Sequence, residues 1–130
     1  GKAVAKALPA LKGKLTSNTI RVPVPNGSLA ILNLEVNTKT SKESLNTILK
    51  KYALEGDLVE QIKYSLSNEL VSTDIVGNNA PSIYDSHATL VSADGKNIVL
   101  YVWYDNEFGY AHQVIRLAKY LAKVRRFTYY

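Results

Sequence analysis

Two stretches of the sequence carry side chains that could recognise a ligand. The first covers residues 104–110 ("YDNEFGY"), where a strand-like apolar run gives way to a helical pattern. Asn106 stands where a helix N-cap is expected, and Asn is a favoured cap. Its amide could instead bond a ligand amide in a cleft walled by Tyr104 and Tyr110, because an amide donates and accepts at once. Glu107 falls in the first turn, where a carboxylate complements the helix dipole.

The second stretch is Arg21 with the Pro-Val-Pro-Asn segment near it. In the alternating pattern of residues 19–24, Arg21 points away from the apolar side chains. A guanidinium on stiff backbone suits bidentate binding of phosphate or carboxylate. A surface arginine or a structural salt bridge explains the same pattern, so both interpretations stay open. His87 and His112 are far apart and lack metal-ligand spacing, so we expect no metal site.

Composition narrows the class of protein. The chain has 130 residues, 46% of them hydrophobic and 21% charged, as expected for one globular domain. No apolar run approaches the roughly 20 residues that span a bilayer, and no secretory signal pattern opens the chain, so we expect a cytoplasmic protein without membrane contact. The absence of cysteine excludes disulfides, zinc–thiolate sites and a cysteine nucleophile within these residues.

The net charge and the N-terminal residues support two further predictions, one about nucleic-acid binding and one about the start of the natural chain. The net charge is +5, but the lysines are spread along the chain and only residues 119–126 form a basic cluster. Solvated surface, or cations offsetting a helix dipole, explains this better than nucleic-acid binding. The chain contains no methionine, and residues 1–8 resemble the middle or end of a helix. We therefore expect that the natural N-terminus lies upstream.

The elements that position these residues follow from periodicity. Helical patterns cover the residues up to Pro9 and the stretch "TSKESLNTILKKYALEG", where Thr40 with Glu43 fits a capping box and Gly56 fits the stop. Residues 19–24, with prolines that suit an edge strand, and residues 29–36 alternate as strands, as do shorter runs at 62–66, 70–76 and 83–91.

The end of the chain carries the clearest turn signal. Asp94-Gly95 predicts a two-residue hairpin that joins residues 83–92 to residues 97–104. A last helix begins near Asn106 and places Val114, Leu117, Ala118 and Leu121 on one side. Consecutive strands without intervening helices predict an α+β domain with a mostly antiparallel (mixed) sheet and helices packed on one face.

Three blocks of sequence resemble one enzyme family. "WYDNEFGYAHQVIRLAKYLA" is similar to the signature near the C-terminus of phosphorylating glyceraldehyde-3-phosphate dehydrogenases. "GKAVAKALPALKGKLTSNTIRVPVPNGSLAILNLEV" and "LVSTDIVGNNAPSIYDSHATLV" resemble two earlier blocks of that family, in the same order. Together they cover nearly the whole chain. The resemblance implies that residues 1–130 are the C-terminal part of the catalytic domain, with the nucleotide-binding domain and the active-site helix upstream.

The resemblance also implies roles for single residues. In this family the asparagine matching Asn106 hydrogen-bonds the nicotinamide carboxamide, and the tyrosine matching Tyr110 lies beside that ring. The residue matching Arg21 binds a substrate or inorganic phosphate. The residue matching Tyr104 lies near the catalytic thiol, and Glu107 is a supporting residue of the same motif.

The implied parent is a glycolytic, homotetrameric oxidoreductase that uses NAD or NADP. It oxidises glyceraldehyde 3-phosphate through a thiohemiacetal and releases the product by phosphorolysis; erythrose 4-phosphate is the alternative substrate. The catalytic cysteine and histidine would lie upstream, so we expect no catalytic residue, bound cofactor or activity in this segment alone. The competing hypothesis is a non-catalytic module that uses the same fold for self-association or nucleic-acid binding.

Overall fold

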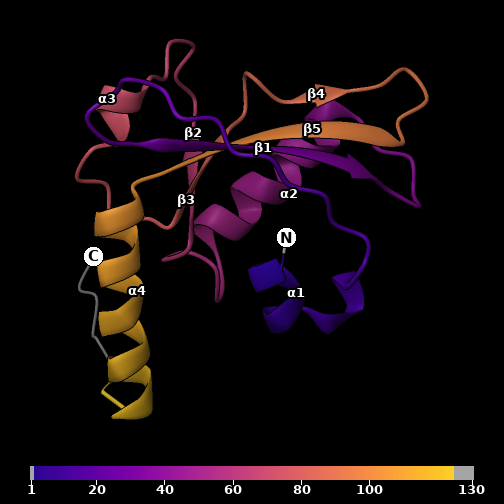
Figure 1. Cartoon of the computed structure of the whole chain (residues 1–130). Helices are drawn as coiled ribbons and strands as arrows, with labels where there is room; N and C mark the ends of the chain where they lie inside the picture. The colour runs from indigo at the N-terminus through magenta and orange to yellow at the C-terminus, as the bar shows by residue number, and fades with distance from the viewer. Residues whose placement is uncertain (1, 125–130) are drawn as a thin grey trace.

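The fold is a small sheet with helices on its faces (Figure 1). The structure is a computed structural model that describes residues 2–124. In chain order the elements are α1 (Lys2–Ala7), a 3-10 turn (Pro9–Leu11), β1 (Ser28–Glu35), α2 (Lys42–Leu54), β2 (Ile62–Ser65), α3 (Ser72–Ile75), β3 (Ser82–Asp85), β4 (Leu90–Val91), β5 (Asn97–Tyr104) and α4 (Asn106–Leu121). Arg125 and Arg126 of the predicted basic cluster, and Gly1, lie outside the described residues.

The sheet has the order β1-β5-β3-β2, with β4 also paired to β5. β2 and β3 run parallel, whereas the other pairs are antiparallel, so the sheet is mixed and the predicted α+β class is confirmed. The register sets Ser28 of β1 opposite Tyr104 of β5. The start of β1 and the end of β5 therefore lie at the same end of the sheet.

A hairpin is present at Asp94-Gly95, but the prediction of a two-residue loop was wrong: Ser92 N donates to Asn97 O at 2.8 Å, so residues 93–96 form the loop. Gly95 has positive φ, whereas Asp94 does not, and a two-residue type I′ turn needs positive φ at both positions.

The long strand predicted before the turn is also broken. β3 and β4 both pair with β5 and are separated by a turn at residues 86–89. Asp85 closes this turn, because its Oδ1 accepts from Ala88 N at 3.0 Å and its carbonyl accepts from Thr89 Oγ1 at 2.9 Å. A side chain that bonds the backbone locally competes with the strand ladder.

The predicted helix at residues 40–56 is present as α2, with a different cap. Ser41 is the N-cap, and its hydroxyl accepts from Ser44 N at 3.2 Å, so the prediction of Thr40 as the cap was wrong. The reason is tertiary: Thr40 N donates to Gly95 O of the hairpin turn at 2.9 Å. The stop is confirmed, since Gly56 follows the helix with φ +82°.

Two predicted strands are absent from the described residues. Residues 19–24 form no strand, and Ile20 is 81% exposed. Prolines 23 and 25 lack the N–H groups a ladder requires. Residues 70–76 contain the short helix α3 instead, because Asp74 Oδ2 accepts from Val71 N at 3.0 Å and closes a turn there. Ile75 of this turn is 1% exposed and belongs to the core.

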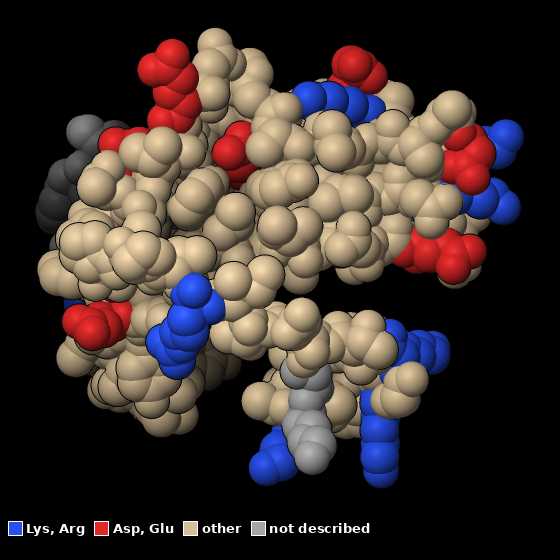
Figure 2. Space-filling view, turned by 45° about the horizontal axis from the view of Figure 1, so that its top comes forward, with Lys and Arg blue, Asp and Glu red and all other residues tan. Residues whose placement is uncertain are grey.

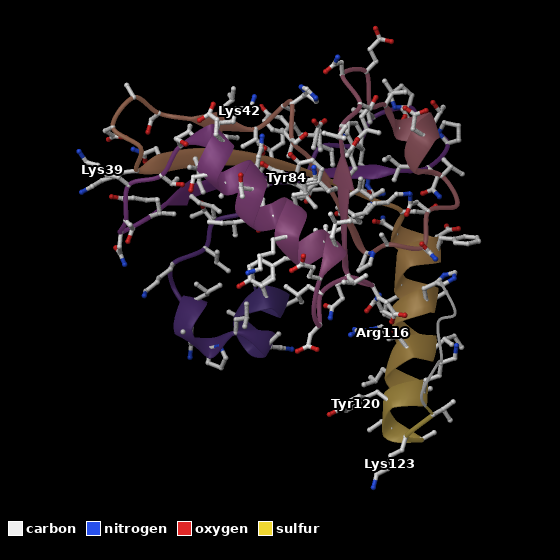
Figure 3. The ribbon with its side chains drawn as sticks, turned by 180° about the vertical axis from the view of Figure 1, so that it is seen from behind. Lys39, Lys42, Tyr84, Arg116, Tyr120 and Lys123 are labelled. Atoms are coloured by element: carbon white, nitrogen blue, oxygen red, sulfur yellow. The ribbon has the colours of Figure 1, made fainter. Side chains whose placement is uncertain are left out.

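The core has a part on each face of the sheet. On one face Tyr84 donates its hydroxyl to Asn46 Oδ1 of α2 at 2.6 Å (Figure 3). Side chains alternate along a strand, so Ile83 points the other way, into a cluster with Ile75 and Ala80. α2 and α4 lie on the same side of the sheet in Figure 1, whereas the short α3 lies on the other.

Helix α4 extends away from the sheet and has little cover. Arg116 on its inner side donates to Glu60 Oε2 at 3.1 Å, while Tyr120 and Lys123 project into solvent (Figure 3). The predicted apolar side of the helix, at Val114 and Leu117, is exposed in this chain. The helix is therefore positioned mainly by its first turn and by this one ion pair.

Candidate functional site

The centre of the candidate site is the junction between β5 and α4. β5 ends at Tyr104, α4 begins at Asn106, and Asp105 lies between them. The N-cap is Asp105, whose side chain accepts from the backbone N–H groups of Glu107 and Phe108. The sequence prediction of a helix starting near Asn106 is confirmed, whereas Asn106 as its cap was wrong. Both residue types cap well, and the position of the strand end decides between them.

The two oxygens of Asp105 have different partners. Oδ1 accepts from Glu107 N and Phe108 N, each at 2.9 Å, and so caps α4. Oδ2 accepts from Asn26 Nδ2 and Gly77 N, each at 2.9 Å, and so holds two loops. The residue is 2% exposed. The hydrogen bond from Phe108 N, followed by that from Gly77 N, lowers the pKa of the Asp105 carboxyl to about 2 from 3.8, against the desolvation that raises it.

Because Asp105 is the cap, the amide of Asn106 is not needed to cap α4. Asn106 is the first residue of α4, is exposed, and its side chain makes no hydrogen bond within residues 2–124. Tyr110 follows one turn later on the same side of the helix and is 73% exposed. Glu107 is exposed in the first turn, as predicted, and Tyr104 is half-buried. The structure thus groups these four candidate residues at one corner.

Arg21 lies in the extended segment that leads to the same corner. Its side chain is exposed and forms no hydrogen bond or ion pair with the described part of the chain. The segment is stiff: Val24 N bonds Val22 O at 2.9 Å across Pro23. It ends at Asn26, which is tied to Asp105, and at Gly27, whose φ of +97° and closeness to Ser72 leave little room for a side chain.

The structural roles of Asp105 and Asn26 were not predicted from the sequence. Asp105 stands next to the residue chosen as cap, and both types carry an acceptor oxygen that suits an N-cap. Asn26 is 79 positions away from Asp105 in the sequence. Its one local signal is its place between Pro25 and Gly27, because Pro, Asn and Gly are typical turn residues. In the structure its Oδ1 accepts from Gly27 N at 2.7 Å.

Arg21, Asn106 and Tyr110 are exposed at this corner. A pocket of about 380 Å³ lies between residues 39–42 and the hairpin turn at 91–95. A second, of about 460 Å³, lies between α1 and residues 11–17. Neither is lined by Arg21 or by residues 104–110. The described residues also hold no cluster of three side chains suited to a metal ion, and none of their helices has the length and apolarity to cross a bilayer.

Comparison with known proteins identifies the family to which the chain is similar. Residues 1–106 match the model of the glyceraldehyde 3-phosphate dehydrogenase C-terminal domain. A glyceraldehyde-3-phosphate dehydrogenase-like protein of Pseudomonas aeruginosa is 51% identical over 122 residues, which are 94% of this chain and 26% of that protein. Glyceraldehyde-3-phosphate dehydrogenase 1 of Bacillus subtilis is 45% identical over 94% of this chain and 36% of its own length.

Glyceraldehyde-3-phosphate dehydrogenase of Geobacillus stearothermophilus is 45% identical over 93% of this chain and 35% of its own length. The chain therefore spans between about a quarter and about a third of the relatives it matches. The family match over residues 1–106 covers the whole mixed sheet and reaches the junction between β5 and α4. The chain belongs to the glyceraldehyde-3-phosphate dehydrogenase C-terminal domain family.

Proposed function

We propose that this chain forms part of the catalytic domain of a phosphorylating glyceraldehyde-3-phosphate dehydrogenase, in which it supplies the nicotinamide and phosphate contacts. The observation that supports the proposal most directly is that capping and ligand contact can be assigned to two different residues at the junction, Asp105 and Asn106. Asp105 caps α4, so the exposed amide of Asn106 stays available for a ligand. An exposed amide at the start of a helix, with a tyrosine one turn away, fits a planar ring that bears a carboxamide.

Each candidate residue has a defined task in this proposal. The Asn106 amide donates to the carboxamide oxygen of NAD or NADP and accepts from its nitrogen, while Tyr110 limits the position of the ring. The bound cofactor supplies the hydride acceptor. Arg21 binds the phosphate of the aldehyde substrate or the inorganic phosphate that releases the product, as a charge-assisted, bidentate donor. Tyr104 and Glu107 support the ring-facing side of the corner.

The nucleophile and the base belong to other parts of the complete enzyme. The chain contains no cysteine, so it offers no thiol to the aldehyde. The matched relatives named as glyceraldehyde-3-phosphate dehydrogenases are about three times longer than the matching region. We expect their remaining length to correspond to the nucleotide-binding domain and the active-site helix, and we expect this chain alone to be inactive.

The proposal includes a homotetramer in the cytoplasm, acting in glycolysis. Support for self-association comes from the sheet face opposite α2, where strand register places Leu29, Ile31 and Leu90 together. These three side chains are exposed, and exposed apolar patches mark association sites. On the face in Figure 2, Lys and Arg lie among Asp and Glu over the upper part of the molecule, whereas the lowest part shows Lys and Arg alone.

Substitution of Arg21 tests the phosphate role in the complete enzyme. Arg21→Ala should raise the KM for inorganic phosphate or for the phosphorylated aldehyde by ten-fold or more, because a charge-assisted hydrogen bond contributes about 1.5–3 kcal/mol. Arg21→Lys should recover part of the loss, since it keeps the charge without the bidentate fork. Lys39→Ala, which removes an exposed cation beside the hairpin turn, is the control. Equal kinetics for Arg21→Ala and the control would remove Arg21 from the site.

A further inference from the structure

The Asp105 carboxylate joins three segments that are distant in sequence. Through Oδ1 it caps α4, the helix that carries Asn106. Through Oδ2 it binds Asn26, at the end of the Arg21 segment, and Gly77, just after α3. With four hydrogen bonds at 2.9 Å and almost no exposure, its position is closely fixed. Capping alone needs only the first oxygen.

The bonds of the second oxygen matter because of what lies on each side. Arg21 precedes Asn26 by five residues, two of which are prolines with fixed φ. Gly27, next in the chain, packs against Ser72 so closely that a Cβ would lie 3.1 Å from the Ser72 carbonyl oxygen. The end of the Arg21 segment is thus held at Asn26 and Gly27, and the bond to Asp105 ties this anchor to the first turn of α4.

We propose that Asp105 is a positioning residue that sets the distance between the phosphate-binding Arg21 segment and the nicotinamide-binding Asn106, through the hydrogen bond between its Oδ2 and Asn26. The inference rests on the function proposed above and goes beyond it by assigning a task to a residue that touches neither ligand. A substrate phosphate and a hydride acceptor must be held in one geometry for transfer. A displacement of about 1 Å at such a site can cost about 100-fold in rate.

Asp105→Asn separates capping from positioning. The remaining amide oxygen can still accept from Glu107 N and Phe108 N, and Asn caps helices about as well as Asp. The new NH2 group replaces Oδ2 and faces two donors, Asn26 Nδ2 and Gly77 N, so the link between the segments is lost. Asn26→Ala removes the same link from the other side and leaves the Asp105 carboxylate three of its four bonds.

The matched structural control is Asp85→Asn. Asp85 is also a buried carboxylate, and it bonds Ala88 N and, at 3.4 Å, Trp103 Nε1, away from Asn26 and Asn106. A role limited to folding predicts that Asp85→Asn and Asp105→Asn both lower the melting temperature and leave kcat of the folded enzyme unchanged. The positioning role predicts a loss of kcat in Asp105→Asn alone.

The experiment measures melting temperature, kcat and KM for the complete enzyme and its variants below their unfolding temperatures. We expect Asp105→Asn to lower kcat/KM about ten-fold or more, mainly through kcat. Asn26→Ala should act in the same direction, and the double variant should be no worse than Asp105→Asn, because both changes break one link. If Asp105→Asn does not fold, the kcat of Asn26→Ala alone tests the positioning role.

Two failures can be told apart. If Asn106→Ala and Arg21→Ala both keep wild-type kinetics, the proposed function fails. If those variants are impaired while Asp105→Asn and Asn26→Ala match the kcat of Asp85→Asn, the function stands and the positioning role is overturned. Additive losses in the double variant would also contradict the inference, because they would show that the two side chains act separately.

Discussion

Asn106→Asp separates ligand recognition from helix stability with a change of a single group. Asn106 occupies the first turn of α4 but does not cap it. A carboxylate at a helix N-terminus stabilises by about 0.3–1 kcal/mol through the dipole. The neighbouring carboxylates of Asp105 and Glu107 oppose this gain. We therefore expect the stability of the variant to stay within about 0.5 kcal/mol of wild type.

The effect on catalysis should be much larger. The Asp side chain cannot donate to the carboxamide oxygen, and a polar ligand group left unpaired costs about 1–3 kcal/mol. Each roughly 1.4 kcal/mol is one decade in rate, so hydride-transfer efficiency should fall about ten-fold or more. The added negative charge should also favour the positively charged oxidised cofactor over the reduced one, so the two forms should respond unequally.

The assay combines a thermal melt with steady-state kinetics on one preparation of the complete enzyme. Asn68→Asp, the same chemical change at an exposed turn between β2 and α3, is the control. An Asn106→Asp variant with wild-type kinetics would refute the assignment of Asn106 to nicotinamide. A large fall in its melting temperature would instead contradict the conclusion that the Asn106 side chain takes no part in holding the first turn of α4.

Three further outcomes follow from the structure. The pKa of Asp105 is lowered to about 2 from 3.8, so its ionised carboxylate stabilises the folded chain above about pH 4, and this stabilisation is lost as pH falls towards 2. The melting temperature of wild type should therefore fall more steeply over that interval than the melting temperature of Asp105→Asn. Gly95→Ala places a Cβ 2.7 Å from Thr40 O at φ +70° and should lower the free energy of unfolding in urea by about 1–3 kcal/mol. Gly56→Ala, at φ +82° with open space around it, should lower it less. Equal losses of stability in the two variants would contradict the role of the Gly95–Thr40 contact. Ile31→Lys on the exposed sheet face should weaken self-association of the chain in sedimentation, and a strictly monomeric wild type would contradict that interface.

Local signals in the sequence were sufficient for much of the fold. Gly95 and Gly56 both adopt positive φ, which glycine reaches without strain, so turns at these positions could be predicted without knowledge of the neighbours. The β1 strand and α4 have long periodic patterns and were also predicted close to their observed bounds. These elements depend on interactions between residues that are near in sequence.

The errors come from contacts between distant residues or from side chains that bond the backbone. Thr40 fits a cap by type, but its N–H is engaged by Gly95 across the fold, and the cap moves to Ser41. Residues 70–76 alternate like a strand, but Asp74 closes a helical turn there. The site shows the same division: the motif around Asn106 was visible in the sequence, whereas the Asn26–Asp105 bond that anchors it was not.

A structure of the complete enzyme with bound nicotinamide cofactor and phosphate is the most direct test of the account. It should place the Asn106 amide within hydrogen-bonding distance of the carboxamide, about 2.7–3.2 Å, and the Arg21 guanidinium at a similar distance from phosphate oxygens. The Asp105 carboxylate should remain between the two, bonded to Asn26. A cofactor whose carboxamide bonds other residues, with Asn106 turned to solvent, would contradict the central claim.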